Sequence, residues 1–274
     1  MISKIITTTL SILTVNGFIE REMNNPDIET YKPIDTVSII IPSFNEEKFI
    51  RKSLSSLRGQ SIISEYPEYF ELILVDSNST DNTVKLASPY VDKIIQTKIR
   101  GKLTARNLAT TYANGNIIVS VDADSYYPHF WLNTLLEPFN NINNPYYNNK
   151  LIGVIGSTYD PNIPLIPAPI RNLAEVLARK LIHPVQMVGR NSAYWKHNFY
   201  QVGLFDESIN QLNNDAMVKE EEYDFGIKLS KIGNVKYKLN ANCIHLGGQK
   251  IGCRLGTIDS NSCKDYKIGI QRFG

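Results

Sequence analysis

The chain has 274 residues, of which 42% are hydrophobic and 20% are charged, and its formal net charge is +2. These values exclude a disordered chain, and the length suits one large α/β domain or two small ones. The sequence has no basic stripe of the kind that binds nucleic acid and no apolar run of about 18 residues that could cross a bilayer, so we expect no nucleic-acid partner.

Residues 1–36 are expected to form an N-terminal arm and a lead-in loop. Residues 5–19 are moderately apolar, but four threonines and a serine dilute them and no A-x-A cleavage site follows, which favours an extra strand or a packed arm over a signal peptide. Residues 21–36 are polar and rich in turn-forming residues. The three cysteines indicate no disulfide framework and favour a reducing, cytoplasmic location.

Strands and helices alternate between residues 37 and 121. Apolar runs predict strands at 37–41, 72–75, 94–95 and 117–121, and helical spacing predicts helices at 49–57, 80–88 and 102–113. This alternation predicts a mostly parallel sheet with helices on both faces. Asn45 is expected to cap the first of these helices, with Glu46 and Glu47 in its first turn.

The second half of the chain is less regular. We expect a strand at 151–157, a proline-rich loop at 160–169, helices at 170–182 and 219–232, and a mildly basic tail at 249–274. The helix at 170–182 either packs on the core or forms a surface that meets a membrane or a lipid-linked acceptor. The sequence has no internal repeat and no clear linker, which indicates one domain.

Polar residues follow three of the predicted strands. They lie at 42–46, at 76–81, and at Asp122 and Asp124. Ligands of open parallel sheets bind at the carboxyl ends of strands, although Ser, Asn and Asp at such places also form plain turns and caps. Two carboxylates that flank one small residue match the oxygen ligands preferred by Mg²⁺ and Mn²⁺. An exposed acidic turn is the alternative interpretation.

Six segments, in this order, resemble the family 2 glycosyltransferases of the GT-A fold. They are VSIIIPSFNEE (37–47), LVDSNSTDNT (74–83), GKLTARNLATTYANGNIIVSVDAD (101–124), MVGRNSAYWKHNFYQVGLFDES (187–208), EEEYDFGIKLSKIG (220–233) and NCIHLGG (242–248). The resemblance implies a Rossmann-like α/β domain at 37–248, with a nucleotide-sugar half at 37–124 and a less regular acceptor half at 125–248. It also implies transfer of a sugar from a nucleotide-diphosphate sugar to the hydroxyl of a glycan or lipid-linked acceptor.

The resemblance implies which residues bind the donor. They are Pro42, Ser43, Asn45, Glu46, Asp76, Ser77, Arg106 and Asp122. Glu46 would lie near the ribose, Asp76 would contact the nucleobase, and Arg106 would face the nucleotide or its phosphates. Many relatives carry a second Asp where this chain has Ser77, which weakens the case for UDP and leaves GDP and dTDP sugars open.

A divalent metal, Mn²⁺ or Mg²⁺, is implied by the same resemblance. Asp124 would bind it directly, Asp122 would hold it through water or contact the ribose, and His245 lies where many relatives place another metal ligand. A structural role is the alternative for His245, because a lone His is more often structural. The sequence Gly189–Ala193 is expected to form the floor of the acceptor side.

The resemblance places the general base at Glu222, in the run 221–225, where the family pattern is E-D-x-D-L. Asp is frequent at that position, so Glu222 extends the reach by one methylene, and Glu220 and Glu221 are the next candidates. The implied reaction is a single inverting displacement. A sugar nucleotidyltransferase and a catalytically inactive nucleotide-sugar-binding module are the alternatives, and a peripheral membrane contact is left open.

Overall fold

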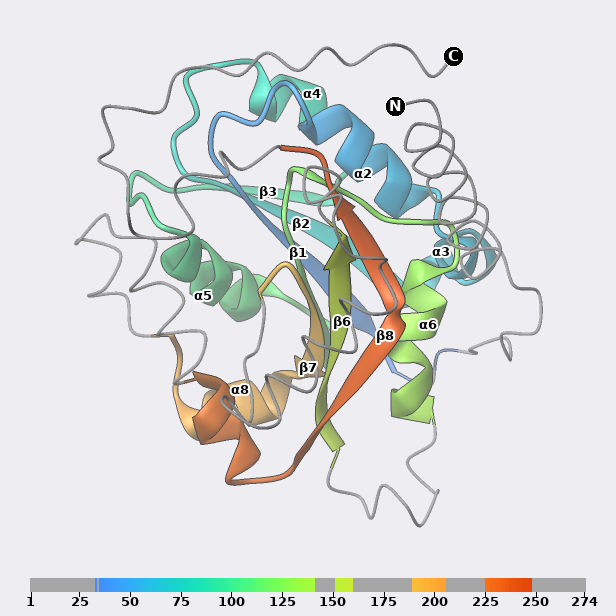
Figure 1. Ribbon diagram of the computed structural model, residues 1–274. Coiled ribbons are helices and arrows are strands. Elements are labelled where there is room, and N and C mark those ends of the chain that lie inside the picture. Colours follow the sequence, from blue (N-terminus) through green and yellow to red (C-terminus); the bar gives the residue numbers. More distant parts are fainter. Residues whose placement is uncertain (1–32, 34, 141–150, 160–188, 206–224, 248–274) are drawn as a thin grey trace, which may run out of the picture.

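The computed structural model describes residues 33, 35–140, 151–159, 189–205 and 225–247 (Figure 1). The described strands form one eight-stranded sheet in the order β3-β2-β1-β4-β7-β6-β8-β5. They are β1 (Val37–Ser43), β2 (Phe70–Asp76), β3 (Lys93–Gln96), β4 (Ile117–Val121), β5 (Ser125–Tyr126), β6 (Leu151–Tyr159), β7 (Asn191–Trp195) and β8 (Asn234–His245). The helices are α2 (Ile50–Arg58), α3 (Ser61–Glu65), η1 (Pro67–Tyr69), α4 (Thr83–Ala87), α5 (Lys102–Tyr112), α6 (Trp131–Asn140) and α8 (Lys196–Val202).

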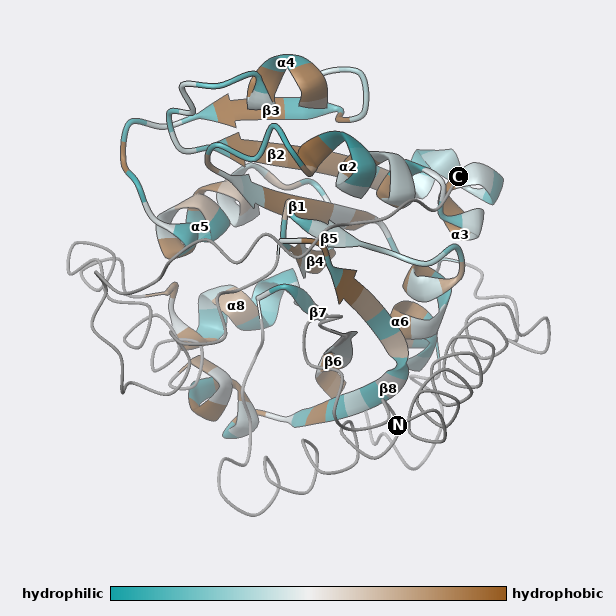
Figure 2. Ribbon diagram, turned by 45° about the horizontal axis from the view of Figure 1, so that its top comes forward, coloured by the Kyte–Doolittle hydropathy of each residue, from teal (hydrophilic) through white to brown (hydrophobic). Residues whose placement is uncertain are grey.

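The first half of the sheet is parallel and covered on both faces. β1 pairs with β2 on one side and with β4 on the other, and β3 pairs with β2. Every residue of β1 is buried, and its isoleucines alternate between faces, because Ile39 and Ile41 pack in one apolar core and Ile40 in the other. Helix α2 contributes to the first core and α5 to the second, and Figure 2 shows the apolar stretches along β1 and β2.

The predicted alternation between residues 37 and 121 is confirmed, with small shifts at the ends of elements. The predicted helix cap is wrong. Helix α2 begins at Ile50, its N-cap Phe49 makes no side-chain hydrogen bond, and no acidic residue lies in its first turn. Asn45 lies too early in the chain to cap α2. It adopts a φ of 53°, and its Oδ1 accepts a hydrogen bond from Thr80 N at 2.9 Å.

The second half of the sheet has mixed strand directions. β7 is antiparallel to β4 and β6, β6 is parallel to β8, and β5 is antiparallel to the end of β8. The strand predicted at 151–157 is confirmed as β6, and residues 225–230 are helical, as predicted for the part of 219–232 that is described. The predicted loop at 160–169 and helix at 170–182 lie outside the described residues. No described helix is long and apolar enough to span a bilayer.

A buried amide joins the strands of the second half to helix α6. Asn191, at the start of β7, is fully buried, and its Oδ1 accepts a hydrogen bond from Trp131 Nε1 at 3.0 Å. Its Nδ2 donates to Ser157 O at 2.6 Å and to Ala241 O at 2.9 Å. A Cβ atom on Gly156 would lie 2.4 Å from this amide, so only glycine leaves room for it. Asn191 therefore holds α6, β6 and β8 around β7.

Candidate active site

Two loops at the carboxyl ends of β1 and β2 are hydrogen-bonded to each other. We call residues 44–49 the first loop and residues 77–82 the second loop. Asn45 N donates to Ser79 Oγ at 2.9 Å, Thr80 N donates to Asn45 Oδ1 at 2.9 Å, and Glu46 N donates to Thr83 Oγ1 at 2.7 Å. The backbone N–H groups of these loops have no partners within a helix or strand, and the side-chain oxygens accept their hydrogen bonds instead. The two loops thereby form one continuous edge of the site.

Asp76 is engaged inside the second loop. Its side chain is fully buried and accepts hydrogen bonds from Ser79 N at 3.0 Å, from Ser79 Oγ, and from Ser43 Oγ at 3.4 Å. The adjacent Ser77 is also buried, and its backbone N donates to Ser43 O at 2.9 Å. The structure thus shows Asp76 shaping the loop, and its predicted contact with a nucleobase stays a prediction.

A cavity of about 290 Å³ opens beside the first loop. It is lined by Pro42, Ser43, Phe44, Glu46, Ser77, Arg100, Gly101, Lys102, Asp122, Ala123 and Asp124. The Arg100 guanidinium lies 4.4 Å from the centre of the Phe44 ring. Six of the predicted site residues therefore line one cavity: Pro42, Ser43, Glu46, Ser77, Asp122 and Asp124. Asn45 and Asp76 instead form hydrogen bonds in the loops beside it.

A larger cavity of about 530 Å³ lies at the opposite end of the sheet. It is lined by Asp35, Asn116, Trp195, Lys196, His197 and Tyr200. Asn116 directly precedes β4 and Trp195 ends the antiparallel β7, so this cavity faces the amino end of β4. The smaller cavity is the candidate active site, because it gathers carboxylates and cations at the carboxyl ends of the parallel strands.

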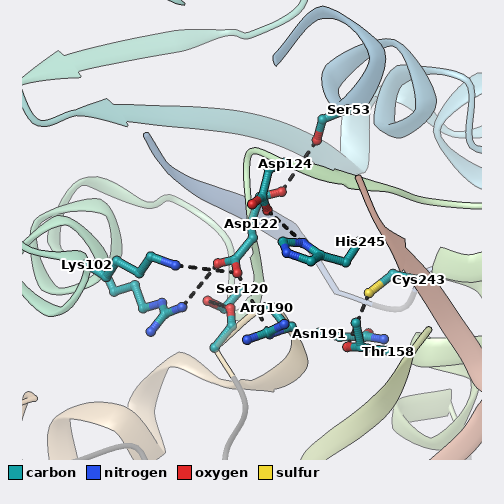
Figure 3. Close-up of polar contacts among 12 residues, drawn as sticks. Ser53, Lys102, Ser120, Asp122, Asp124, Thr158, Arg190, Asn191, Cys243 and His245 are labelled. Carbon is teal, nitrogen blue, oxygen red and sulfur yellow. Dashed lines mark hydrogen bonds and ion pairs between the residues drawn. The ribbon is translucent and has the colours of Figure 1, made fainter. Parts of the chain in front are cut away.

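Asp122 follows β4 directly and is surrounded by cations (Figure 3). Its Oδ1 lies 3.4 Å from Arg106 Nη2, and its Oδ2 lies 3.7 Å from Lys102 Nζ and 3.9 Å from Arg190 Nε. Burial by itself raises the pKa of Asp122, but Lys102, Arg106 and Arg190 outweigh it and lower the pKa to about 2. Asp122 is therefore ionised at neutral pH and neutralised by protein side chains.

Arg106 extends from α5 and is almost completely buried, with 1% exposed. Gly189 lies against its guanidinium: a Cβ atom at this glycine would lie 2.0 Å from Arg106 Cζ. Ser120 Oγ donates a hydrogen bond to Gly189 O, which fixes that backbone beside β4. Residues 191–193 belong to the buried strand β7, and their predicted role as the floor of the acceptor side stays a prediction.

Asp124 and His245 meet although 120 residues separate them in the chain. β5 pairs antiparallel with β8 in a register that places Ser125 opposite His245, and Leu246 N donates to Asp124 O at 2.8 Å. Asp124 Oδ1 then lies 3.4 Å from His245 Nδ1 (Figure 3). Asp124 Oδ1 and both ring nitrogens of His245 are buried and have no hydrogen-bond partner among the described residues.

The pair of Asp124 and His245 fits a divalent cation. Buried polar atoms without partners cost about 1–3 kcal/mol each, and a carboxylate oxygen and an imidazole nitrogen aimed at each other are common metal ligands. Among the described residues no three His, Cys, Asp or Glu side chains form a group able to hold an ion. Asp122 thus stands apart as the partner of three cations, and its predicted role as a metal ligand stays a prediction.

Glu46 lies close to the same two aspartates. Burial raises its pKa most, and the negative charges of Asp124 and Asp122 raise it further, whereas Lys102 lowers it; the resulting pKa is about 7. Glu46 is therefore partly protonated near neutral pH when no cation lies beside Asp124. A positive charge beside Asp124 would favour the ionised form.

The raised pKa of Glu46 predicts a pH-dependent stability. The folded state binds this proton more tightly than the unfolded state, so the free energy of unfolding should fall as the pH rises from 4.5 to about 7. Urea unfolding in EDTA at about pH 5 and about pH 7.5 should show this loss in the wild type and a smaller loss in Glu46→Gln. The exposed Glu68→Gln serves as control. Equal pH dependence in the wild type and Glu46→Gln would contradict the assignment.

Four site residues had no individual role assigned from the sequence, although two of them, Phe44 and Arg190, lie within the predicted segments 42–46 and 189–193. Arg100 and Lys102 flank Gly101, whose φ of 146° only glycine adopts readily, directly before α5. Phe44 lies at the cavity, and Arg190 approaches Asp122 from the start of β7. Two positively charged residues that flank a glycine at the start of a helix are typical of an anion-binding site, and this pattern is visible in the sequence. Glu222 lies outside the described residues.

The sequence and the fold have known relatives. The model of Glycosyl transferase family 2 matches residues 38–197, more than half of the 274 residues. The poly(ribitol-phosphate) beta-N-acetylglucosaminyltransferase TarS of Staphylococcus aureus is 34% identical over 96 residues, which cover 32% of this chain and 16% of TarS. A dolichyl N-acetyl-alpha-D-glucosaminyl phosphate 3-beta-D-2,3-diacetamido-2,3-dideoxy-beta-D-glucuronosyltransferase of Methanococcus voltae is 27% identical over 224 residues, 75% of this chain and 64% of that enzyme.

A solved structure shares the architecture. The mannosyltransferase PcManGT from Pyrobaculum calidifontis, in complex with GDP-Man and Mn²⁺, superposes with a TM-score of 0.57 at 21% identity, covering 88% of this chain and 67% of that one. This likeness confirms the predicted GT-A α/β fold. The chain spans less than two thirds of the length of TarS and of the Methanococcus voltae enzyme. The family match over residues 38–197 shows that the chain belongs to glycosyl transferase family 2.

Proposed function

We propose that the chain transfers a sugar from a nucleotide-diphosphate sugar to the hydroxyl of an acceptor, with the help of a divalent metal. The observation that carries this proposal is the pair of Asp124 and His245, in which Asp124 Oδ1 and both ring nitrogens are buried and have no hydrogen-bond partner among the described residues, beside a cavity that also gathers cations. A sugar diphosphate needs both features: a divalent cation to neutralise it and fixed positive side chains around it.

The described residues have separate roles in this proposal. Asp124 and His245 would hold Mn²⁺ or Mg²⁺, which when bound neutralises charge on the diphosphate. Arg106 is buried and paired with Asp122, and Gly189 leaves room for its guanidinium, so it is preorganised to stabilise the charge that builds up on the leaving nucleoside diphosphate. Asp122 keeps this arginine oriented and stays ionised, which suits a contact to the ribose or to a metal-bound water.

The acceptor hydroxyl requires a general base, and we assign this role to Glu222. It removes the acceptor proton as the acceptor oxygen attacks the anomeric carbon from the side opposite the diphosphate, so the configuration inverts. The assignment is supported by its position in the segment 220–233, which resembles the family pattern. We retain 37–124 as the nucleotide-sugar half and 125–248 as the acceptor half of the domain.

The acceptor is proposed to be a glycan or a lipid-linked sugar. A lipid-linked acceptor is supported by the Methanococcus voltae relative, whose name gives a dolichyl phosphate-linked sugar, and that relative covers 75% of this chain. The donor nucleotide is one of UDP, GDP and dTDP. Ser77 lines the cavity with its side chain buried, and it offers a hydroxyl where a carboxylate would accept a hydrogen bond from uracil.

A donor panel tests this function directly. Hydrolysis or transfer should be measured with UDP-, GDP- and dTDP-sugars in the presence of Mn²⁺, Mg²⁺ or EDTA. We expect one nucleoside diphosphate to be released, only with metal, and the same nucleotide and metal together to raise the melting temperature. Donor binding without turnover would indicate an inactive module. Neither release nor a thermal shift with any donor would refute the donor-site assignment.

A further inference from the structure

The larger cavity, of about 530 Å³, is separate from the candidate active site. Asn116, which lines it, directly precedes β4, whereas Asp122 and the smaller cavity follow the carboxyl end of the same strand. No described residue lines both cavities. Sites for small molecules typically have volumes of about 300–1,000 Å³ and a lining of aromatic rings with a few polar groups. The larger cavity thus has the size and lining of a second ligand site.

Three aromatic side chains from β7 and α8 line this cavity. The Trp195 ring packs against Phe139 of α6, with ring centres 5.3 Å apart and an interplanar angle of 80°. The His197 ring lies 6.1 Å from the Trp195 ring at an angle of 33°. Tyr200 is 47% exposed, and its hydroxyl donates to Thr110 O at 3.4 Å, where α8 lies beside α5 (Figure 1). Contacts with α5 and α6 therefore fix two of these rings before any ligand binds, which lowers the cost of binding.

The cavity also has one carboxamide and two side chains of opposite charge. Asn116 Nδ2 donates to Asp35 Oδ1 at 2.7 Å, and Lys196 Nζ donates to Ala113 O. The carboxylate and the ammonium cancel, each is hydrogen-bonded to a neutral group, and no arginine is among the described lining residues, so the cavity is poorly suited to a phosphate. The second Asp35 oxygen and the Asn116 amide oxygen are acceptors that suit a hydroxyl group.

We propose that this cavity binds a neutral sugar ring of a glycan, as a second ligand site outside the active site. The polarised C–H groups on the face of a sugar ring pack against the electron-rich faces of aromatic rings, which Trp195 and Tyr200 supply. Sugar hydroxyls both donate and accept hydrogen bonds, so they suit Asp35, Asn116 and the indole N–H of Trp195. A nucleotide would require more cations, and an acyl chain would remove water from Asp35 and Asn116 without replacing its hydrogen bonds.

A sugar site at the amino end of β4 has a consequence for the choice of acceptor. This consequence rests on the proposed function, whereas the site itself does not. A glycan that is bound in the larger cavity and also reaches the active site is held at two places, so its effective concentration at the active site rises. A glycan too short to span both places gains nothing. The second site would therefore favour long acceptors over short ones.

Direct binding tests the site in the absence of donor and metal. Maltotriose, mannotriose and triacetylchitotriose are titrated into the protein in EDTA, and binding is followed by calorimetry and by tryptophan fluorescence. The chain has two tryptophans, of which Trp131 is buried and Trp195 lines the cavity. We expect at least one trisaccharide to bind saturably and to change the fluorescence. UDP, GDP and dTDP should not compete with it under these conditions.

Two variants at exposed positions locate the binding in this cavity. Tyr200→Ala removes an aromatic face and should weaken trisaccharide binding by about tenfold. Asn116→Ala removes a hydrogen-bonding group and should weaken it by about fivefold. Tyr112→Ala is the matched control, because Tyr112 is 53% exposed at the end of α5 and does not line the cavity, and it should leave the affinity unchanged.

The outcomes separate this site from the proposed function. If no trisaccharide binds, or if Tyr200→Ala and Asn116→Ala bind it as well as the wild type does, the sugar site is refuted. If a nucleoside diphosphate binds in EDTA and Tyr200→Ala weakens that binding, the cavity is a nucleotide site and the proposal is also refuted. The donor panel with metal decides the proposed function independently, because its failure would leave trisaccharide binding in EDTA unaffected.

Discussion

Asp124→Asn should lower kcat/KM for the donor by about 10³-fold, because it removes the proposed metal ligand and with it several kcal/mol of charge stabilisation in the transition state. Asp124 Oδ1 is buried, lies 3.4 Å from His245 Nδ1, and has no hydrogen-bond partner among the described residues. The amide of asparagine keeps the shape of the side chain but loses its charge. Steady-state kinetics at saturating Mn²⁺ would measure the loss of kcat/KM. Calorimetric titration of Mn²⁺ in the presence of the nucleoside diphosphate would measure the loss of Mn²⁺ affinity.

His245→Gln should act on the same site through metal affinity. We expect the Mn²⁺ concentration for half-maximal activity to rise by about 10–100-fold. Glu68→Gln, which neutralises an exposed carboxylate in η1, serves as the matched control and should leave both quantities unchanged. If Asp124→Asn kept wild-type kcat/KM and Mn²⁺ affinity, the metal would have to lie elsewhere or be absent from the reaction.

Asn191→Leu should lower the free energy of unfolding by about 4 kcal/mol, because three buried groups lose their partner and each such loss costs about 1–3 kcal/mol. The groups are Trp131 Nε1, Ser157 O and Ala241 O. Leucine branches at the same atom as asparagine and leaves no cavity, but its two methyl groups are larger than the amide oxygen and nitrogen, so overpacking adds to the loss of hydrogen bonding. Urea unfolding followed by circular dichroism would measure the effect.

Two further variants separate the contribution of this network from a general effect of substitution in β7. Ser192 is 1% exposed, and its Oγ has no hydrogen-bond partner among the described residues, so Ser192→Ala should change stability by less than about 1 kcal/mol. Trp131→Phe removes one of the three hydrogen bonds of Asn191. Its loss in the free energy of unfolding should lie between those of Ser192→Ala and Asn191→Leu. A similar loss in Ser192→Ala and Asn191→Leu would show that the amide has no special role.

The parallel half of the sheet could be predicted because its residues carry the pattern of a strand buried on both faces. The run 37–41 contains only one polar residue, and the runs 72–75 and 117–121 are similar. Such runs, separated by amphipathic helices, leave few other arrangements. The residues after each strand then meet at one edge of the sheet, which is why most of the predicted donor residues line the same cavity.

The strands β7 and β8 could not be predicted in the same way. β7 begins with Asn191 and Ser192, which are polar yet buried, and the hydrogen-bond partners of Asn191 come from α6, β6 and β8. β8 carries lysines and asparagines along most of its length, so its sequence lacks the apolar run of a buried strand. Its residues alternate instead between polar and apolar from Asn234 to Cys243, which is the pattern of a half-buried strand, and the pairing with β6 and β5 places it in the sheet.

The strand register of the sheet decides which charged residues meet in the site, as the cations around Asp122 show. β4 and β7 pair so that Val121 lies opposite Asn191, and the neighbouring residues Asp122 and Arg190 therefore come together, although 67 residues separate them. His245 reaches Asp124 through the register of β5 and β8 in the same way. The sequence motifs marked the individual residues as candidates, but which of them become partners follows from pairings that no local pattern contains.

The hydrogen bonds between the first and second loops have a consequence for engineering the donor specificity. Asn45 and Glu46 of the first loop depend on Ser79, Thr80 and Thr83, so each loop is shaped by side chains that belong to the other. A graft of one loop from a relative would leave backbone donors and acceptors without partners. The two loops behave as one exchangeable cassette, and a chimera that changes nucleotide preference should carry residues 44–49 and 77–83 from the same parent.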